Sequence, residues 1–359
     1  MRTDPTPLRV GLIGYGFAGK TFHAPLIQAT PGLALSAVAS GDAAKVARDL
    51  PQAEVVRDPF QLASHAAVDL VVIASPNATH APLAAAALRA GKHVVVDKPF
   101  TLDLAQAREL AALAEHSGRL LSVFQNRRWD SDYLAVKRAI ADGMAGTVRH
   151  VESHIDRYRP AVRERWREQA VAGAGIWYDL GPHLVDQALQ LFGLPGRVSA
   201  RLAAQRAGAQ VDDWAHVRLD YGPLQVLLHA SMLVAGGVAR FTVHGDRGSL
   251  CKPLGDRQEA QLLAGVAPGA AGWGEDPDAL VIHHGDGSSR RIPVPAGDYR
   301  RYYAAIRDAI AGTAANPVPP AQAVAVMAVL EAAIASDREG RTTVPALTAE
   351  ERAAWQRSV

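Results

Sequence analysis

The sequence predicts an α/β protein of two domains: an N-terminal doubly wound parallel sheet, and a C-terminal α+β domain with a large, mostly antiparallel sheet. Over the first ~125 residues, short apolar runs alternate with helical stretches, which is typical of βα units in a parallel sheet. After that point several strand-like runs follow one another without helices between them, which indicates antiparallel pairing. The length of 359 residues also exceeds one ordinary core. We therefore expect domains at 1–125 and 126–359.

The strands of the first domain are expected to be short apolar runs, because both faces of such a sheet are covered by helices. The run DLVVIA at 69–74 is a clear example, since it is bounded by a turn. Other strands are expected at 8–13, 33–39, 93–96 and 120–124, with helices ending near residues 29 and 50 and spanning 78–90 and 104–116.

The second domain is expected to combine longer alternating strands with a few helices. The stretch 255–278 is rich in Gly, Ala and Pro and predicts a surface loop. Helices are expected at 131–141, 176–192, 299–311 and 321–337, and strands at 147–155, 198–204, 215–221, 225–232, 240–244 and 249–252.

Charge and composition argue against several classes of protein. The 38 Lys and Arg residues against 36 Asp and Glu leave a net charge of +2, so nothing favours nucleic acid or an anionic membrane as a partner. Cys251 is the single cysteine, which excludes an intrachain disulfide and a cysteine-clustered zinc site. Glycines interrupt the first apolar stretch, and the most apolar later stretch, 321–336, contains Gln322 and Glu331. We therefore expect a cytoplasmic protein without a membrane span.

A glycine-rich motif at 14–19 fits the pattern G-x-G-x-x-G, directly after an apolar strand and before a helix. The first glycine allows the tight turn, the second lets the backbone approach a pyrophosphate, and the third lets the helix pack closely on the strand. Amide groups at the helix start then hold the phosphates. This context predicts a Rossmann domain that binds NAD or NADP through Gly14, Tyr15, Gly16, Phe17, Ala18 and Gly19.

The end of the second strand favours NADP over NAD. NAD enzymes usually place an acid there to bind the ribose 2′-hydroxyl, whereas this chain has Ser40. Asp42 comes late and is expected to cap the next helix. Ser40 together with Lys45 or Arg48 could hold a 2′-phosphate.

Polar residues follow two buried strands at the carboxyl edge of the predicted sheet, where open α/β folds bind ligands. Asp97-Lys98-Pro99 follows the strand at 93–96, and Lys98 is expected to point into the cleft. The turn after the strand at 69–74 supplies further cofactor-binding candidates, although its residues also suit ordinary turn and N-cap roles: Ser75, Pro76, Asn77 and His80.

Asp179 and His183 lie four residues apart in a predicted helix, which places both side chains on one face. Pro182, between them, either kinks this helix or occupies its first turn. The neighbouring Leu180 and Leu184 serve the core, so folding does not need the polar pair. On its own, such a pair is more often structural than catalytic.

The motif at 14–19, Asp97-Lys98-Pro99 and Asp179-x-x-x-His183 together resemble the Gfo/Idh/MocA (glucose-fructose oxidoreductase/inositol dehydrogenase) family, over nearly the whole chain. In that family the lysine is usually preceded by Glu, and Asp97 is one methylene shorter. Four stretches are similar to NADP-dependent scyllo-inositol dehydrogenases and their bacterial relatives: 11–27, 121–132, 156–160 and 175–187.

The resemblance implies hydride exchange between a nicotinamide and a carbinol carbon of a cyclic polyol or sugar. It implies that His183 is the general base on the hydroxyl, a task that suits the ordinary histidine pKa of about 6.5. Asp179 would bind a neighbouring hydroxyl and orient His183, and Lys98 would stabilise the developing alkoxide and contact the cofactor. Other candidates lie on connections expected to rim the cleft, where salt bridges are the alternative: Asn126 and Trp166 for the cofactor, and Arg127, Arg157 and Tyr158 for the substrate.

Two other functions fit the same fold. One is an NAD-dependent glycoside hydrolase, which uses a transient redox step. The other is a dinucleotide-sensing regulator without catalysis, which would not need Lys98, Asp179 and His183 together.

No metal site is expected. His150 and His154 fall on one predicted strand, where four residues span roughly 13 Å. His283 and His284 would point to opposite faces. We expect a small polyol or sugar as substrate, and a homodimer or homotetramer formed through the broad antiparallel sheet.

Overall fold

The structure, a computed structural model, describes residues 6–358. It divides into two compact units. The first unit runs to Asn126 and also contains Gln258–Trp273 and Asp298–Val324, which the sequence analysis placed with the C-terminal domain. The second unit contains Arg127–Arg257, Gly274–Gly297 and the chain from Ala325 onward. The chain therefore returns to the first unit twice.

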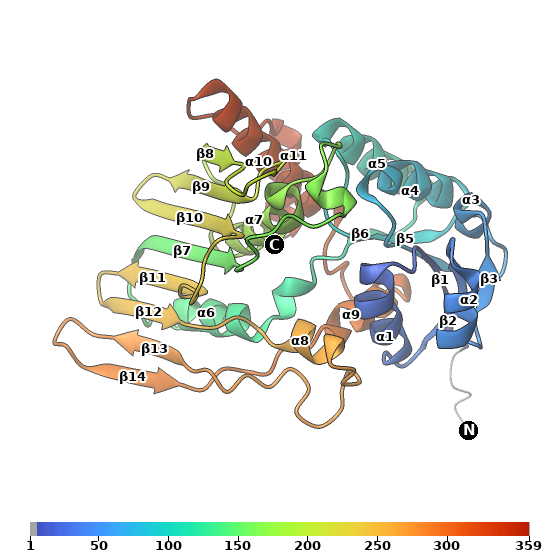
Figure 1. Cartoon of the computed structure of the whole chain (residues 1–359), viewed down its shortest axis with the longest axis horizontal. Coiled ribbons are helices and arrows are strands. Elements are labelled where there is room, and N and C mark those ends of the chain that lie inside the picture. Colours follow the sequence, from blue (N-terminus) through green and yellow to red (C-terminus); the bar gives the residue numbers. More distant parts are fainter. Residues whose placement is uncertain (1–5, 359) are drawn as a thin grey trace. The chain divides into compact units, whose positions relative to one another are not determined.

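The first unit contains a six-stranded parallel sheet with the strand order β3-β2-β1-β4-β5-β6 (Figure 1). From β1 the chain adds strands first toward one edge (β2, β3) and then, from β4, toward the other edge. This strand order confirms the predicted doubly wound sheet. The short strand β3 was not predicted. The strands are β1 (Leu8–Ile13), β2 (Leu33–Ala39), β3 (Glu54–Val56), β4 (Leu70–Ile73), β5 (His93–Val96) and β6 (Leu121–Val123).

Helices cover both faces of this sheet; α4 and α5 lie above it and α1 and α9 below it in Figure 1. Aspartates begin three of them: Asp42, Asp58 and Asp103 each accept a backbone N–H of the first turn. The cap expected from Asp42 is thereby confirmed. After a π-helical turn at Gly19–His23, the helices of the main segment are α1 (Ala24–Gln28), α2 (Ala43–Asp49), α3 (Pro59–Ala63), α4 (His80–Arg89) and α5 (Leu104–Ser117).

The two later segments add helices to the first unit. The helix α8 (Gln258–Leu263) falls inside the stretch that was expected to be a surface loop, so that expectation was wrong there. The helix α9 (Arg300–Ile310) packs against α1 and buries Tyr302, Tyr303 and Ile306. Apolar and aromatic burial therefore joins α9 to the Rossmann sheet.

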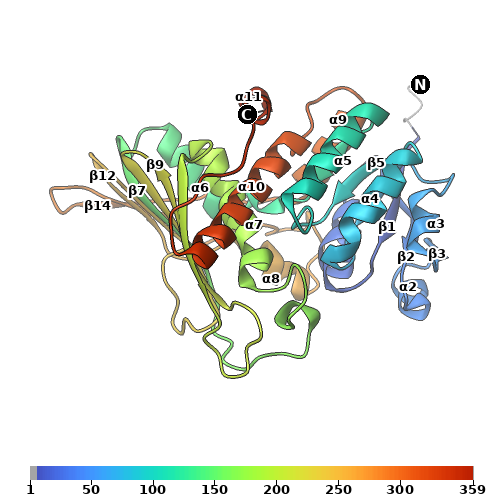
Figure 2. The same cartoon turned by 90° about the horizontal axis from the view of Figure 1, so that it is seen from above.

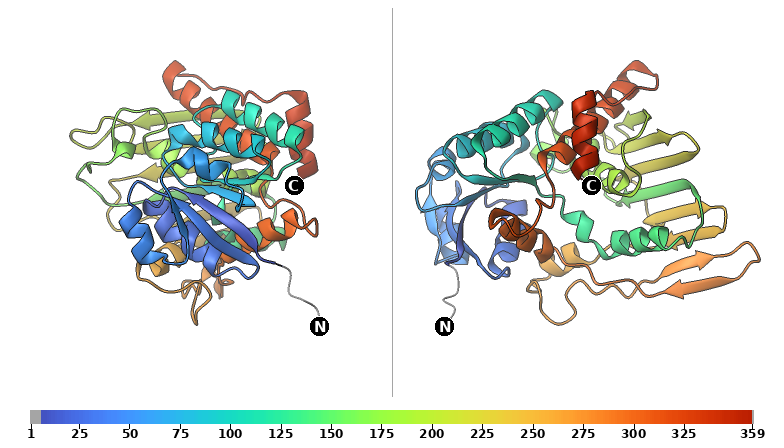
Figure 3. Two further views of the ribbon diagram at one scale, coloured as in Figure 1. Left: turned by 90° about the vertical axis from the view of Figure 1, so that its right-hand side faces the viewer. Right: turned by 180° about the vertical axis from the view of Figure 1, so that it is seen from behind.

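The second unit contains an eight-stranded sheet with the order β14-β13-β12-β11-β7-β10-β9-β8. Every neighbouring pair is antiparallel except β7 and β10, which confirms the mostly antiparallel sheet. The β13–β14 hairpin, orange at the edge of this sheet in Figure 3, was not predicted. The strands are β7 (Val148–Asp156), β8 (Arg197–Ala203), β9 (Trp214–Tyr221), β10 (Leu224–Ser231), β11 (Phe241–Gly245), β12 (Gly248–Lys252), β13 (Leu280–His283) and β14 (Ser289–Ile292).

One face of this sheet carries the core of the second unit. Val151, Val217 and Leu228 are buried, and α7 (Ile176–Phe192) packs against β7, β9 and β10. Figure 2 shows α6 (Ser131–Ala141) and α7 against the same side of the sheet. Within the described part of the second unit, no helix lies on the opposite face, where polar side chains alternate with the buried ones.

The last long helix, α10 (Pro320–Glu339), is the one helix in residues 6–358 that is long and apolar enough to span a membrane. Its most apolar stretch is 67% buried inside the structure, as expected for the core helix of a folded domain. The chain ends with α11 (Ala349–Ser358).

Candidate active site

The glycine-rich motif forms the turn between β1 and the following helix. Gly14 has a φ of +98°, and a Cβ there would lie 2.6 Å from the carbonyl oxygen of Ala74, directly after the neighbouring strand β4. A Cβ on Gly19 would collide with the Gly14 carbonyl oxygen, so both positions require glycine. Gly16 differs, because nothing lies within 4 Å of its Cβ position. The open side at Gly16 is where a pyrophosphate can approach the backbone.

The end of β2 brings Ser40 and Lys45 to this turn. The Ser40 hydroxyl accepts the backbone N–H of Asp42 at 3.1 Å, and the Asp42 carboxylate accepts the N–H of Lys45 at 3.0 Å. Lys45 Nζ donates to the Tyr15 carbonyl oxygen at 3.0 Å and lies 5.3 Å from the centroid of the Tyr15 ring. Arg48, the other cation considered, instead pairs with Asp49 at 3.0 Å. Of the two cations considered for a 2′-phosphate, Lys45 contacts the motif directly, whereas Arg48 pairs with Asp49.

Asp97 and Lys98 follow β5 at the carboxyl edge of the sheet. The Asp97 carboxylate is buried; one oxygen accepts the Lys98 backbone N–H at 2.8 Å, and the other lies 3.7 Å from His23 Nε2. Burial acts to raise the pKa of Asp97, but the contact with His23 and the charge of Lys98 outweigh it and lower that pKa. The carboxylate is therefore anionic and fixes the backbone that carries Lys98.

His23 is buried, with 1% of its surface exposed, and joins α9 to this edge. Its Nδ1 lies 2.6 Å from the Tyr303 hydroxyl, and its ring packs 4.3 Å from the ring of Phe124. Tyr303 was missed by the sequence reasoning, since it lies 280 positions further along the chain than its partner. The three side chains of Asp97, His23 and Tyr303 form a buried polar row that ends at the Lys98 backbone N–H.

The turn after β4 is tied to the turn after β5 by His80. This side chain is buried, with Nδ1 2.8 Å from the Pro99 carbonyl oxygen and Nε2 3.0 Å from the Ser75 carbonyl oxygen. Burial lowers the pKa of His80, so its neutral form is favoured. Both ring nitrogens lie within hydrogen-bond distance of backbone carbonyl oxygens, and the neutral ring can donate its one N–H to either of them. This gives His80 a positioning role between the two turns. Asn77 is also buried, in a short 3₁₀ turn at Asn77–Thr79.

Asp179 and His183 lie on α7 in the second unit. The helix runs without a break through Pro182, so the two side chains lie one turn apart on the same face. Their exposure differs: His183 is 5% exposed, and Asp179 is half-buried with its carboxylate 3.6 Å from Arg167 Nε. Of the two positions considered for Pro182, the structure shows the one inside the helix and not the one in its first turn.

Close packing holds α7 at this position. A Cβ on Gly181 would lie 2.8 Å from the Trp177 ring and 3.0 Å from Leu330 on α10, so only glycine fits without movement. The start of α7 is held by Asp212, whose carboxylate accepts the Trp177 backbone N–H at 2.8 Å. Burial raises the pKa of Asp212 to about 6.

A polar pocket lies beside the start of α7, lined in part by Arg167, Asp179, Arg206 and Asp212. Arg206 is buried and pairs with Glu168 at 3.1 Å and Asp213 at 2.9 Å. Because it also donates to two backbone carbonyls of the 157–172 segment, this arginine-rich segment is anchored.

The remaining predicted residues lie on connections of the two units. Trp166 packs under the Arg167 guanidinium, 4.5 Å from the ring centroid, and Tyr158 is 60% exposed after the end of β7. Arg127 pairs with Asp130 at 3.2 Å, and Asn126, at the end of the first unit, is buried.

One buried ion pair on α7 was not predicted. Arg128 pairs with Asp186 at 2.6 Å, and Asp186 lies three residues after His183, close to the same helix face. That spacing was visible in the sequence, but the partner on another segment was not. The pair fixes the middle of α7 to the short turn at Asn126–Trp129.

Comparisons with known proteins agree with the fold and the motifs. Residues 8–125 match the model of an oxidoreductase family with an NAD-binding Rossmann fold, and residues 137–345 match the C-terminal alpha/beta domain of that family. The chain is 52% identical over 339 residues to the uncharacterized oxidoreductase YdgJ of Escherichia coli strain K12, covering 93% of this chain and 98% of that protein. It is 37% identical over 340 residues to the scyllo-inositol 2-dehydrogenase (NADP(+)) IolW of Bacillus subtilis strain 168, covering 93% of this chain and 95% of that protein.

A solved structure gives the same result. The crystal structure of a protein described as a putative oxidoreductase from Klebsiella pneumoniae superposes with a TM-score of 0.93 and 57% sequence identity, covering 98% of this chain and 99% of that one. The resemblance inferred from the motifs is confirmed. The chain belongs to the Gfo/Idh/MocA oxidoreductase family and carries that family's NAD(P)-binding Rossmann domain.

Proposed function

We propose that this chain is an NADP-dependent dehydrogenase or reductase that acts on a carbinol or ketone carbon of a cyclic polyol or sugar, with scyllo-inositol as the first candidate. The observation that carries the proposal is the unbroken course of α7, which sets Asp179 and His183 one turn apart. The similarity to IolW, whose name specifies scyllo-inositol and NADP(+), supports the substrate and the cofactor.

The cofactor fits the residues of the first unit. The open side at Gly16 can admit the pyrophosphate, and Ser40 and Lys45 can hold a 2′-phosphate. Lys98 follows β5 at the same sheet edge, where it can contact the nicotinamide ribose. The bound cofactor supplies the hydride acceptor or donor, so the protein contributes alignment and electrostatics.

The residues of α7 supply the proton transfer. During oxidation His183 would take the hydroxyl proton, and during reduction it would return that proton to the oxygen. Asp179, whose carboxylate lies 3.6 Å from Arg167 Nε, would accept a hydrogen bond from a neighbouring hydroxyl and fix the ring of the substrate. The Lys98 ammonium would stabilise the developing alkoxide.

Absorbance at about 340 nm, which follows NADPH as in any nicotinamide-linked reaction, tests the proposal. Purified protein is mixed with NADP⁺ or NAD⁺ and a panel of inositols, aldoses and other polyols. Turnover is expected with scyllo- or myo-inositol and NADP⁺. It should fall by at least about 100-fold in both Lys98→Ala and His183→Ala, the usual size of a lost general acid–base or electrostatic contribution.

Matched controls separate chemistry from folding. Lys137→Ala removes an exposed lysine of α6, and His244→Ala removes an exposed histidine of β11. Both should retain turnover. No turnover across the panel, despite tight NADP⁺ binding, would contradict the substrate class and favour the sensing regulator. Release of sugar from glycosides without net NADH or NADPH would indicate the hydrolase instead.

A further inference from the structure

The face of the antiparallel sheet that carries no helix in the described part of the second unit is rich in histidine. Residues at alternate positions of β7 share this face, and paired residues on neighbouring strands share it as well. The register pairs His154 of β7 with His229 of β10, and His229 with His216 of β9. Glu152 and Asp156 flank His154 on the same face.

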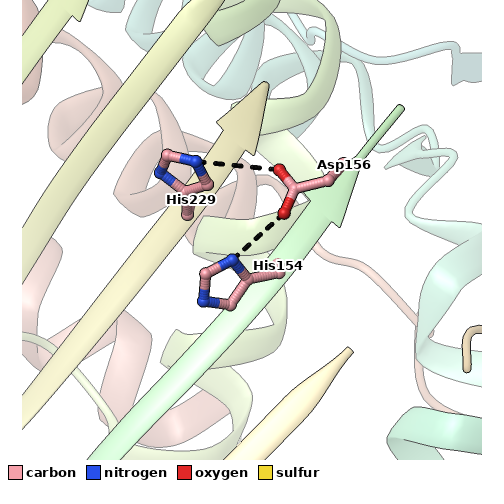
Figure 4. A group of neighbouring side chains, drawn as sticks. All are labelled: His154, Asp156 and His229. Carbon is pink, nitrogen blue, oxygen red and sulfur yellow. Dashed lines mark hydrogen bonds and ion pairs between the residues drawn. The ribbon is translucent and has the colours of Figure 1, made fainter. Parts of the chain in front are cut away.

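Within this face, His154, Asp156 and His229 converge on one point, as Figure 4 shows. One potential ligand atom from each lies within 4.8 Å of the other two. His154 Nδ1 is 3.2 Å from Asp156 Oδ2, and His229 Nε2 is 3.8 Å from Asp156 Oδ1. Tetrahedral ligands about 2 Å from a zinc ion are about 3.3 Å apart, so the set needs only small movements to close on one ion.

The Asp156 carboxylate provides independent support. Its side chain is 5% exposed, and its Oδ1 is buried without a hydrogen-bond donor. A buried carboxylate oxygen left in this state is costly unless a cation approaches it. The oxygen faces His229 Nε2, on the side where the two imidazoles converge.

The outer contacts of both histidines leave the inward nitrogens available as ligands. His154 Nε2 lies 3.2 Å from Glu152 Oε2, so an N–H at Nε2 can donate to Glu152 and leave the Nδ1 lone pair facing Asp156. His229 Nδ1 lies 3.3 Å from His216 Nδ1, so His229 can donate there and keep its Nε2 lone pair. Second-shell acceptors of this kind orient the histidine ligands in metal sites.

We propose that His154, Asp156 and His229 form a binding site for a divalent transition-metal ion, with zinc as the reference ion. Two imidazoles and one carboxylate suit zinc, whereas magnesium and calcium prefer oxygen ligands alone. Three protein ligands leave one coordination position for water or an added anion. The ion would join β7 to β10 directly before the segment that begins at Arg157.

The expectation that no metal site exists rested on pairs within one strand. It considered His150 with His154 and His283 with His284, but His229 comes from a strand that begins more than 60 residues after β7 and lies directly opposite His154. Only the parallel pairing of β7 with β10 reveals the site.

The test is a zinc titration of the full-length, untagged protein in competition with a chromophoric chelator. All variants also carry Cys251→Ser, because Cys251 lies on the same face two strands away and could bind zinc by itself. One equivalent of zinc is expected to bind, without competition from magnesium. His229→Gln and Asp156→Asn should each weaken the affinity by more than the roughly 10–100-fold that a lost second-shell partner costs.

Two further variants make the result specific. Glu152→Gln removes only the outer partner of His154 and should weaken binding about 10-fold. His244→Gln changes an exposed histidine on the same face and should bind zinc like the parent protein. The proposal would be overturned if His244→Gln lost as much zinc affinity as His229→Gln, or if the parent protein bound zinc no more tightly than His229→Gln.

A second readout covers variants that fold poorly. Cobalt bound in a tetrahedral nitrogen and oxygen site should give intense visible absorption, and this band should be lost in His154→Gln, His229→Gln and Asp156→Asn. Zinc should also raise the thermal unfolding temperature of the parent protein, because it binds only the folded state. An octahedral cobalt spectrum, or the same zinc-induced shift in His229→Gln, would contradict the assigned ligands.

Discussion

Replacing Lys45 with alanine should weaken NADP⁺ binding and leave NAD⁺ binding nearly unchanged. The side chain is already held at the glycine-rich turn, because Nζ donates to the Tyr15 carbonyl oxygen at 3.0 Å and lies 5.3 Å from that ring. A cation fixed beside the ribose end of the cofactor loses little conformational entropy on binding. NADP⁺ differs from NAD⁺ by the 2′-phosphate, which is the group that Lys45 would contact.

The size of the effect follows from one charged hydrogen bond. Such a bond contributes about 1.5–3 kcal/mol, which corresponds to about a 10-fold to 150-fold change in Kd. Lys45 is half-buried, so solvent and salt screen part of its charge. We therefore expect an increase in the Kd for NADP⁺ of about 10-fold to 30-fold near 0.1 M salt, growing as the salt concentration is lowered.

Fluorescence or calorimetric titration of both cofactors measures this difference. Lys45→Arg should retain most of the preference for NADP⁺, since it retains the charge. Arg48→Ala is the discriminating variant, because Arg48 lies on the same helix but pairs with Asp49 at 3.0 Å. Equal weakening of NAD⁺ and NADP⁺ by Lys45→Ala would mean that Lys45 only supports the turn. A larger effect of Arg48→Ala would assign the phosphate to the other cation.

Three further predictions concern stability. Between about pH 4 and pH 6 the unfolded Asp212 loses its proton while the folded one, with a pKa raised by burial from 3.8 to about 6, keeps it; wild-type stability therefore falls as pH rises. Across this window the free energy of unfolding of Asp212→Asn should rise relative to that of wild type by up to about 3 kcal/mol, measured by urea unfolding at several pH values, and a pH-independent difference would contradict the raised pKa. Gly181→Ala should lower the free energy of unfolding by about 1–3 kcal/mol, because its Cβ would lie 2.8 Å from the indole one turn earlier. Gly285→Ala, where no atom lies within 4 Å of the Cβ position, should leave the free energy of unfolding nearly unchanged. Tyr303→Phe should lower the free energy of unfolding by about 1–3 kcal/mol, because it leaves a buried histidine nitrogen without its 2.6 Å partner. Tyr158→Phe, at a side chain that is 60% exposed, should leave the unfolding midpoint unchanged. Equal effects of the two substitutions would refute the role of the buried hydroxyl.

The fold was predictable where both faces of an element are covered. Strands such as β4 (Leu70–Ile73) are wholly buried and therefore read as unbroken apolar runs. The strands that escaped prediction have little apolar signal: β3 is three residues long with an exposed Glu54, and β14 carries Arg290 and Arg291 on an exposed edge. Their pairing comes from neighbouring strands and not from their own composition.

The site was predictable where its chemistry is local in sequence. The motif at 14–19, the cap at Asp42 and the four-residue spacing of Asp179 and His183 all depend on one element each. Contacts between distant segments could not be read in this way. The pair of Arg128 with Asp186, for example, needs the position of α7 relative to a turn 58 residues earlier.

The support of Lys98 shows how such distant contacts bear on function. Asp97 fixes the Lys98 backbone with one carboxylate oxygen, and the other oxygen faces His23, which is held in turn by the Tyr303 hydroxyl. The position of Lys98 thus depends on α9, a helix that returns to the first unit after all eight strands of the second sheet have been built. The Asp97 carboxylate binds the adjacent backbone directly. Since a misplacement of about 1 Å can cost about 100-fold in rate, a substitution in α9 that disturbs Tyr303 should lower turnover without changing any residue that touches substrate.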